Sequence, residues 1–149
     1  MQKLTVIIPV YNESKTILEI IIKVLKVNIN KQIIVVDDFS NDGTREIIKD
    51  LINIDKIIFH EKNLGKGAAI KSAIPFINGR IVAIQDADLE YDPDDINKLL
   101  KIAIDEKKDF VIGHRIMKTT IKHPYFYFRE LAVNSLTLLL NVLYRTSIK

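Results

Sequence analysis

The stretch Gln32-Ile-Ile-Val-Val-Asp-Asp-Phe-Ser-Asn-Asp-Gly-Thr44 joins a continuous apolar run to two carboxylates and a turn. An apolar run without polar alternation is typical of a strand buried on both faces of a parallel sheet. The turn Ser40-Asn-Asp-Gly43 then leads into a helical pattern over 44–52. This stretch predicts an α/β fold in which polar residues gather where the strands end.

The same alternation of strand and helix recurs along the chain. Strands are predicted over 4–8, 32–36, 56–60, 80–85 and 109–113, and helices over 13–27, 44–52, 66–76 and 94–106. Such βαβ units imply a mostly parallel sheet with helices on both faces, which is a Rossmann-like three-layer α/β/α sandwich. Open sheets of this kind bind ligands beyond the carboxyl ends of their strands. Unusual side chains at those ends are therefore candidates for a binding site.

Composition excludes several classes of function. A chain of 149 residues with 48% apolar and 28% charged residues is a globular domain, not a disordered segment. Its net charge of +3 comes from scattered basic residues, so no nucleic-acid partner is expected. The lack of cysteine excludes disulfides, thiolate metal sites and cysteine nucleophiles. Without a signal peptide or an apolar run of ~20 residues, the protein is expected to be cytoplasmic.

Three carboxylates follow the strand predicted over 80–85. Side chains two apart in an extended segment face the same way, so Asp86, Asp88 and Glu90 are expected to converge. Oxygen ligands suit a hard cation, Mg²⁺ or Mn²⁺, held jointly with a diphosphate. The alternative, a solvated acidic turn, accounts for the acidic residues of 92–95 at a helix N-terminus. It does not account for Asp86 and Asp88, which lie too far upstream.

Two further clusters stand at the first two strand ends. In Pro9-Val-Tyr-Asn-Glu13, Tyr11 can stack on a base, while Asn12 and Glu13 can bind a ribose or cap the next helix. The adjacent Asp37 and Asp38 point in opposite directions, so that one faces the cleft and the other braces the loop.

The stretch Asn63-Leu-Gly-Lys-Gly67 precedes the third helix. Gly65 and Gly67 allow close backbone approach to a phosphate or sugar, and Lys66 adds a positive charge. The alternative is a plain helix-entry turn. The stretch is neither a Walker A loop nor a GxGxxG fingerprint, because residues that those motifs require are missing.

Together these clusters, followed by Gly113-His-Arg115, resemble family-two GT-A glycosyltransferases, most closely their polyprenol-phosphate branch. The likeness runs from about Leu4 to Arg115. It implies a GT-A fold and a metal-dependent, inverting hexosyltransferase that moves a sugar from a UDP- or GDP-linked donor to a polyprenyl or dolichyl phosphate. A lipid acceptor would place the enzyme at the cytoplasmic face of the membrane.

The resemblance also assigns roles to residues. Asp86 and Asp88 correspond to the family's Asp-x-Asp motif, which binds the metal and the donor diphosphate, and Glu90 is a third candidate ligand. Arg115, a catalytic candidate with the two aspartates, and Arg129 match positions that contact the acceptor phosphate. The predicted nucleotide-binding residues are Pro9, Tyr11, Asn12, Glu13, Asp38, Asn63, Gly65 and Lys66.

The chain also departs from that branch. His114 stands where serine is usual, Phe39 replaces a small residue, and the members of the branch continue beyond the point where this sequence stops. We therefore expect a nucleotide-sugar-binding core over 1–115. An acceptor-side loop and an amphipathic C-terminal helix, shortened relative to that branch, are expected over 116–149.

Several alternatives remain open from sequence. The helical pattern over 125–144 suits either a bilayer interface or packing on the sheet or a partner subunit, so an oligomer is compatible with it. A glycan acceptor would need a carboxylate base, and no clear candidate follows Asp109. A nucleotidyltransferase and a non-catalytic nucleotide-sugar-binding fragment are the rival functions. The first lacks its usual glycine- and arginine-rich loop after the first strand.

Overall fold

Four parallel strands form one sheet in the order β3-β2-β1-β4 in the computed structural model, which describes residues 4–113 and residue 135. The central strands, β1 (Leu4–Val10) and β2 (Lys31–Asp37), are almost wholly buried. β3 (Lys56–Phe59) pairs with β2, and β4 (Ile81–Ile84) pairs with β1. All pairs are parallel, so the carboxyl ends of the strands lie at one edge of the sheet.

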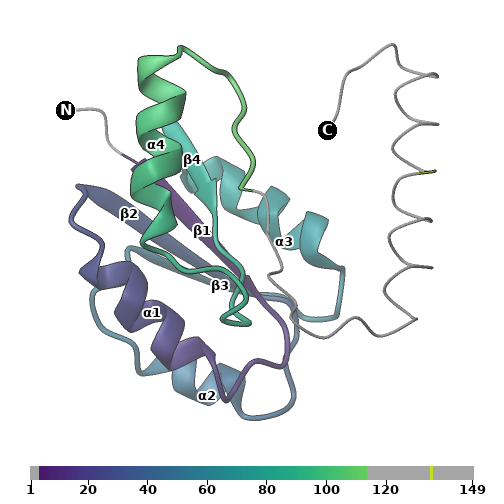
Figure 1. Ribbon diagram of the computed structural model, residues 1–149. Coiled ribbons are helices and arrows are strands. Elements are labelled where there is room, and N and C mark those ends of the chain that lie inside the picture. Colours follow the sequence, from purple (N-terminus) through teal and green to yellow (C-terminus); the bar gives the residue numbers. More distant parts are fainter. Residues whose placement is uncertain (1–3, 114–134, 136–149) are drawn as a thin grey trace. The chain divides into compact units, whose positions relative to one another are not determined.

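Helices cover both faces of this sheet (Figure 1). One face packs against α1 (Ile17–Lys26), α2 (Thr44–Lys49) and α4 (Asp95–Asp105). The other packs against α3 (Lys66–Ala73), which continues into the short 3₁₀ helix η1 (Ile74–Phe76). Successive strand residues point to opposite faces, so β1 gives Val6 and Ile8 to the first core and Ile7 to the second. The predicted three-layer α/β/α sandwich is confirmed.

The prediction of a strand over 109–113 is wrong. The segment is irregular and pairs with no strand of the described sheet, and Phe110 and Ile112 are 78% and 73% exposed. β-branched residues favour an extended backbone, but a strand also needs a neighbour whose N–H and C=O groups it can bind. Local propensity alone therefore gave the wrong element.

The chain divides into two compact units, residues 1–113 and 114–149, and only the first is described in detail. Of the loop and helix predicted over 116–149, only Ser135 is described, and it is helical and exposed. Within the described part of the chain, no helix is long and apolar enough to cross a bilayer.

Candidate active site

A pocket of about 390 Å³ opens where β1, β2 and β4 end. Its volume is in the range of small-molecule and cofactor sites. Nine residues predicted from sequence to bind the donor or the metal line it, together with Val10, Ala69 and Ala87. The nine are Pro9, Tyr11, Glu13, Asp38, Asn63, Gly65, Lys66, Asp86 and Asp88.

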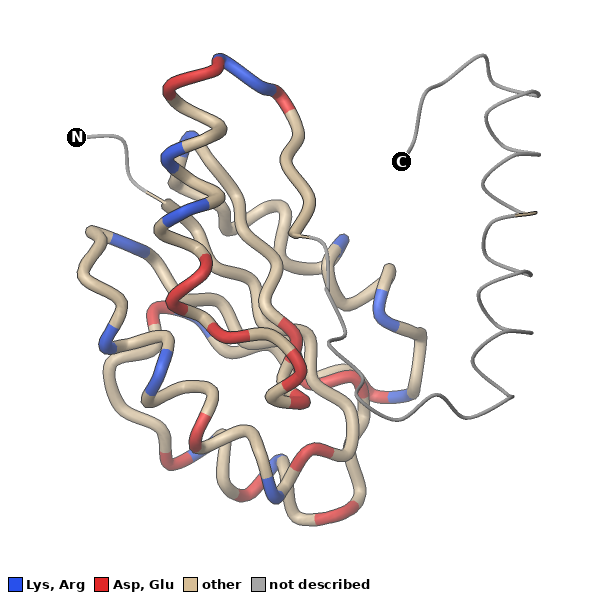
Figure 2. Tube along the Cα trace, in the orientation of Figure 1, with Lys and Arg blue, Asp and Glu red and all other residues tan. Residues whose placement is uncertain are grey.

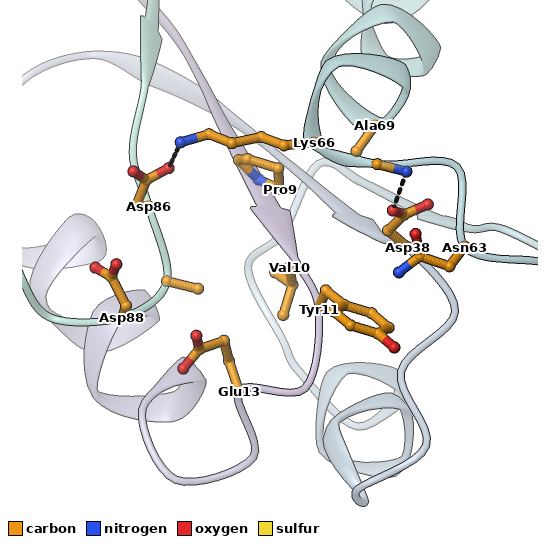
Figure 3. Close-up of a pocket in the computed structure, with 12 residues that line it drawn as sticks. Pro9, Val10, Tyr11, Glu13, Asp38, Asn63, Lys66, Ala69, Asp86 and Asp88 are labelled. Carbon is orange, nitrogen blue, oxygen red and sulfur yellow. Dashed lines mark hydrogen bonds and ion pairs between the residues drawn. The ribbon is translucent and has the colours of Figure 1, made fainter.

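The pocket has two chemically different ends (Figure 3). At one end the exposed ring of Tyr11 lies beside Asp38 and Asn63. At the other end lie Asp86 and Asp88. This arrangement offers an aromatic and amide surface at one end and paired carboxylates at the other.

The loop after β1 is held by the loop after β2. The Ser40 hydroxyl accepts from the backbone N–H of Asn12 at 2.9 Å, and the Thr44 hydroxyl accepts from that of Glu13 at 2.9 Å. The Asn12 side chain accepts in return from the N–H of Asn41 at 2.9 Å, with Asn12 in a left-handed conformation at φ 56°. Asn12 is thus the one predicted nucleotide-binding residue that does not line the pocket, and it braces the two loops instead.

The neighbouring carboxylates Asp37 and Asp38 point apart, as predicted. Asp37 is fully buried, and its Oδ2 lies 3.0 Å from Nε of Arg45 on α2. The Arg45 guanidinium also lies 5.0 Å from the ring centre of Phe59 and 5.7 Å from that of Phe39. Phe39 therefore contributes an aromatic contact to the arginine that neutralises Asp37.

Asp38 faces the pocket but is also tied to the loop before α3. Its carboxylate accepts from Nδ1 of His60 at 2.7 Å and from the backbone N–H groups of Leu64 at 2.9 Å and Gly65 at 2.6 Å. Burial raises the pKa of the Asp38 carboxyl, but these hydrogen bonds outweigh burial and hold the pKa below its usual value. Asp38 is therefore a carboxylate at neutral pH.

Gly65 and Lys66 bring the amino end of α3 to the pocket. Gly65 has φ 87°, which a side chain would disfavour, and Lys66 is the first residue of the helix. The free N–H groups of a helix's first turn attract anions. The ammonium of Lys66 lies 2.5 Å from Oδ1 of Asp86, so its charge reaches across to the carboxylate end of the pocket (Figure 3).

Acidic residues recur along the connection from β4 to α4 (Figure 2). This connection is bent rather than extended, because Leu89 has φ 61° and Asp88 Oδ1 accepts from the N–H of Glu90 at 2.9 Å. The structure brings two of the three expected carboxylates into the pocket: Glu90 does not line it, and no three acidic or histidine side chains cluster at metal-binding distance among the described residues. Asp86 and Asp88 both line the pocket, at the end opposite Tyr11 (Figure 3).

Two site residues predicted from sequence, Arg115 and Arg129, lie outside the described residues. One residue of the site was not predicted from sequence: His60, which directly follows β3 and binds the pocket carboxylate Asp38. Its position at a strand's carboxyl end is the signal that could have identified it, because the other clusters stand at the same edge.

Curated relatives match this chain over most of its length. The dolichol-phosphate mannosyltransferase of Pyrococcus furiosus is 32% identical over 133 residues, which cover 87% of this chain and 38% of the relative. The UDP-N-acetylglucosamine–dolichyl-phosphate N-acetylglucosaminyltransferase of Methanococcus voltae is 35% identical over 129 residues, covering 74% and 51%. The chain therefore spans about half or less of these relatives. Their names confirm the resemblance to the polyprenol-phosphate branch.

Solved structures share the fold. The mannosyltransferase PcManGT from Pyrobaculum calidifontis, in complex with GDP-Man and Mn²⁺, superposes with a TM-score of 0.58 at 25% identity, covering 86% of this chain and 38% of that one. S. aureus TarS residues 1–349 with UDP-GlcNAc gives 0.64 at 22% identity, covering 81% and 37%. These likenesses confirm the GT-A fold.

The family model described as glycosyl transferase family 2 matches residues 5–146, which is nearly the whole chain. The match includes all four described strands apart from the first residue of β1, and it includes both ends of the pocket. This chain belongs to glycosyl transferase family 2.

Proposed function

We propose that this chain forms the donor site of a metal-dependent, inverting glycosyltransferase that moves a sugar from a nucleoside diphosphate to a polyprenyl phosphate. The observation that carries the proposal is the two-ended pocket, in which Tyr11, Asp38 and Asn63 lie apart from Asp86 and Asp88. A nucleoside suits the first end, because an aromatic ring stacks on a base and a carboxylate accepts from base N–H or ribose O–H groups. The diphosphate then extends toward Lys66 and the paired carboxylates.

The donor set at the second end suits a hard divalent cation. Mg²⁺ and Mn²⁺ bind proteins through one or two carboxylates and take their remaining oxygens from substrate phosphates and water. Asp86 and Asp88 would supply that pair, with the remaining oxygens coming from the diphosphate and water. A cation bound there would stabilise the negative charge that builds up on the leaving nucleoside diphosphate. We propose Asp86 and Asp88 as its protein ligands, with the ion being Mg²⁺ or Mn²⁺.

The chain's own groups have defined tasks in this reaction. Lys66 and the first turn of α3 stabilise the diphosphate, and Asp38 orients the nucleoside so that the anomeric carbon faces the acceptor. Attack by the acceptor opposite the leaving diphosphate inverts the anomeric centre. Arg115 and Arg129, by the family resemblance, would hold the acceptor phosphate.

A lipid phosphate is the acceptor that we favour. The relatives from P. furiosus and M. voltae carry dolichol- or dolichyl-phosphate in their names. A phosphate monoester is already anionic, so its oxygen can attack without a general base, whereas a sugar hydroxyl would need one. Such an acceptor would bring the site to the cytoplasmic face of a membrane.

The test measures donor binding by calorimetry, with UDP-GlcNAc and GDP-mannose titrated with and without Mn²⁺. We expect one donor to bind only when metal is present, and we expect Asp88→Asn to lose this metal-dependent binding. Asp105→Asn at the end of α4, an exposed carboxylate outside the pocket, is the matched control and should bind as the wild type does.

A second measurement separates the enzyme from a binding fragment. Wild-type protein is incubated with the donor that binds, Mn²⁺ and a short-chain polyprenyl phosphate, and transfer of labelled sugar to lipid is followed. Binding with transfer supports the enzyme, and binding without transfer supports a nucleotide-sugar-binding unit. If folded wild-type protein binds neither donor under any condition, the proposed donor site is wrong.

A further inference from the structure

We propose that His60 is a positioning residue of the donor site, which holds the pocket carboxylate Asp38 in place and is itself held by Ser72 on α3. The inference rests on the proposed nucleoside-binding role of this pocket. It adds to the site two side chains that do not line the pocket and that the sequence motifs do not include.

The three side chains form a continuous chain of hydrogen bonds. Nδ1 of His60 lies 2.7 Å from Oδ1 of Asp38, and Nε2 lies 2.9 Å from Oγ of Ser72. The side chains of His60 and Asp38 are only 7% and 4% exposed. Their contact is therefore shielded from water. A hydrogen bond to a charged group is stronger in such a buried position than at the surface.

The backbone around His60 is fixed as well. Its N–H donates to the carbonyl of Asp37 at 2.9 Å, and its carbonyl accepts from Arg45 at 2.9 Å. The imidazole therefore has little freedom to leave Asp38. Through His60, which follows β3, the chain of bonds joins the end of β2 to α3. The end of β2 and the start of α3 both line the pocket, whereas β3 does not.

The bonding pattern also fixes which ring nitrogen carries the proton. The Asp38 carboxylate can only accept, so the Nδ1 that faces it must donate. In the neutral ring Nε2 is then an acceptor, and the Ser72 hydroxyl donates to it. Ser72 thus favours the tautomer that Asp38 needs.

A count of lone pairs shows what this arrangement leaves for a ligand. A carboxylate has about four acceptor positions. On Asp38, Oδ1 accepts from His60 and Leu64, and Oδ2 accepts from Gly65, among the bonds that the described residues make. One position on Oδ2 remains. His60 therefore anchors one carboxylate oxygen so that the other can take a single donor from the nucleoside.

The order Ser72–His60–Asp38 is also that of a hydrolase triad, in which the serine is the reacting group. Here the carboxylate lines the pocket, while the serine is the penultimate residue of α3 and does not line it. The roles are therefore reversed: the carboxylate is the group that faces the ligand, and the serine and histidine hold it in position.

The test compares nucleotide binding by three variants, with the nucleoside diphosphate that the wild-type protein binds as the probe. His60→Leu removes a donor that fixes Asp38 in place. If the displaced carboxylate loses its single hydrogen bond to the nucleoside, nucleotide affinity should fall about tenfold, the usual effect of losing one charged hydrogen bond. His60→Asn should recover most of that loss, because its side-chain amide nitrogen takes the place of Nδ1. Ser72→Ala should cause a smaller loss, of roughly two- to threefold.

Two controls show that the effect is one of positioning. Urea unfolding identifies any variant that has lost its fold, and Mn²⁺ binding without nucleotide should be unchanged in all three. Unchanged nucleotide affinity in folded His60→Leu, or His60→Asn no better than His60→Leu, would overturn the inference alone. Lack of nucleotide binding by wild-type protein would overturn the proposed function and the inference with it.

Discussion

The ammonium of Lys66 lies 2.5 Å from Oδ1 of Asp86, so a cation of the protein itself neutralises the first carboxylate of the proposed metal pair. Lys66 is 57% exposed on a flexible stem, and Asp86 is 27% exposed. Ion pairs of this exposure contribute about 0–1 kcal/mol, because water screens them. The lysine can therefore leave Asp86 when a divalent ion and a diphosphate bind.

This relationship predicts opposite effects of Lys66→Met on two ligands. Affinity for Mn²⁺ alone should rise by roughly two- to fivefold, because the competing ammonium is gone. Affinity for the nucleoside diphosphate with Mn²⁺ should fall about tenfold, because a charged hydrogen bond to phosphate is lost. Calorimetry measures both, and Lys71→Met, outside the pocket on the same helix, is the control. Weaker Mn²⁺ binding by Lys66→Met would show that the lysine does not compete with the metal.

A substitution of Glu90 tests whether the bend after β4 keeps this side chain away from the proposed metal ion. Because its side chain does not line the pocket, Glu90→Gln should change Mn²⁺ affinity by less than about twofold, whereas Asp88→Asn should reduce it by roughly tenfold or more. Isothermal titration of Mn²⁺ into both variants measures the difference. A similar loss in the two variants would show that Glu90 is the third ligand, as the sequence predicts.

The position of the pocket could be predicted because the sequence shows where the strands end. Pro9, Asp38 and Asp86 each follow an apolar run, and parallel pairing necessarily brings such ends to one edge. The opposite directions of Asp37 and Asp38 follow from the alternation of side chains in a strand. These features depend on local pattern and on topology alone.

Other features depend on backbone conformations and contacts that no local pattern reveals. Leu89 at φ 61° turns Glu90 out of line, although leucine seldom adopts that conformation. The contact of His60 with Asp38 spans 22 residues and that with Ser72 spans 12, so both require α3 to be packed on the sheet. The strand predicted over 109–113 failed for a similar reason, because pairing needs a neighbour.

The buried pair Asp37–Arg45 should be important for stability. Arg45→Met leaves a fully buried carboxylate without its cation, so the free energy of unfolding should fall by about 3 kcal/mol. Adding Asp37→Asn to this variant should recover part of the loss, because the remaining group is neutral. Urea unfolding of both variants checks the prediction. If the double variant is less stable than Arg45→Met, the buried charge is not the cause.

A second stability test lies at the opposite edge of the sheet. The Thr5 hydroxyl donates to the Gln32 side chain at 2.8 Å and accepts from the N–H of Gly79 at 3.0 Å. Thr5→Val keeps the shape but leaves the Gly79 N–H without this acceptor, so the free energy of unfolding should fall by about 1–3 kcal/mol. Nucleotide affinity should not change, because Thr5 lies near the amino end of β1. Parallel loss of binding and stability would contradict this separation.

Asp42 predicts how stability depends on pH. Burial raises the pKa of its carboxyl, but hydrogen bonds from Thr44 and Ser14 outweigh burial and hold the pKa far below its usual value. A carboxyl whose pKa is lower in the folded protein stabilises the fold at any pH above its pKa in the unfolded chain, about 3.9. This stabilisation is lost as the pH falls toward the pKa of the folded protein.

Asp42→Asn should therefore lower the urea midpoint at neutral pH, and its difference from wild type should shrink below about pH 4. Asp105→Asn, an exposed aspartate at the end of α4, is the control. A difference between wild type and Asp42→Asn that is constant from neutral pH to about pH 2 would mean that the Asp42 charge does not stabilise the fold.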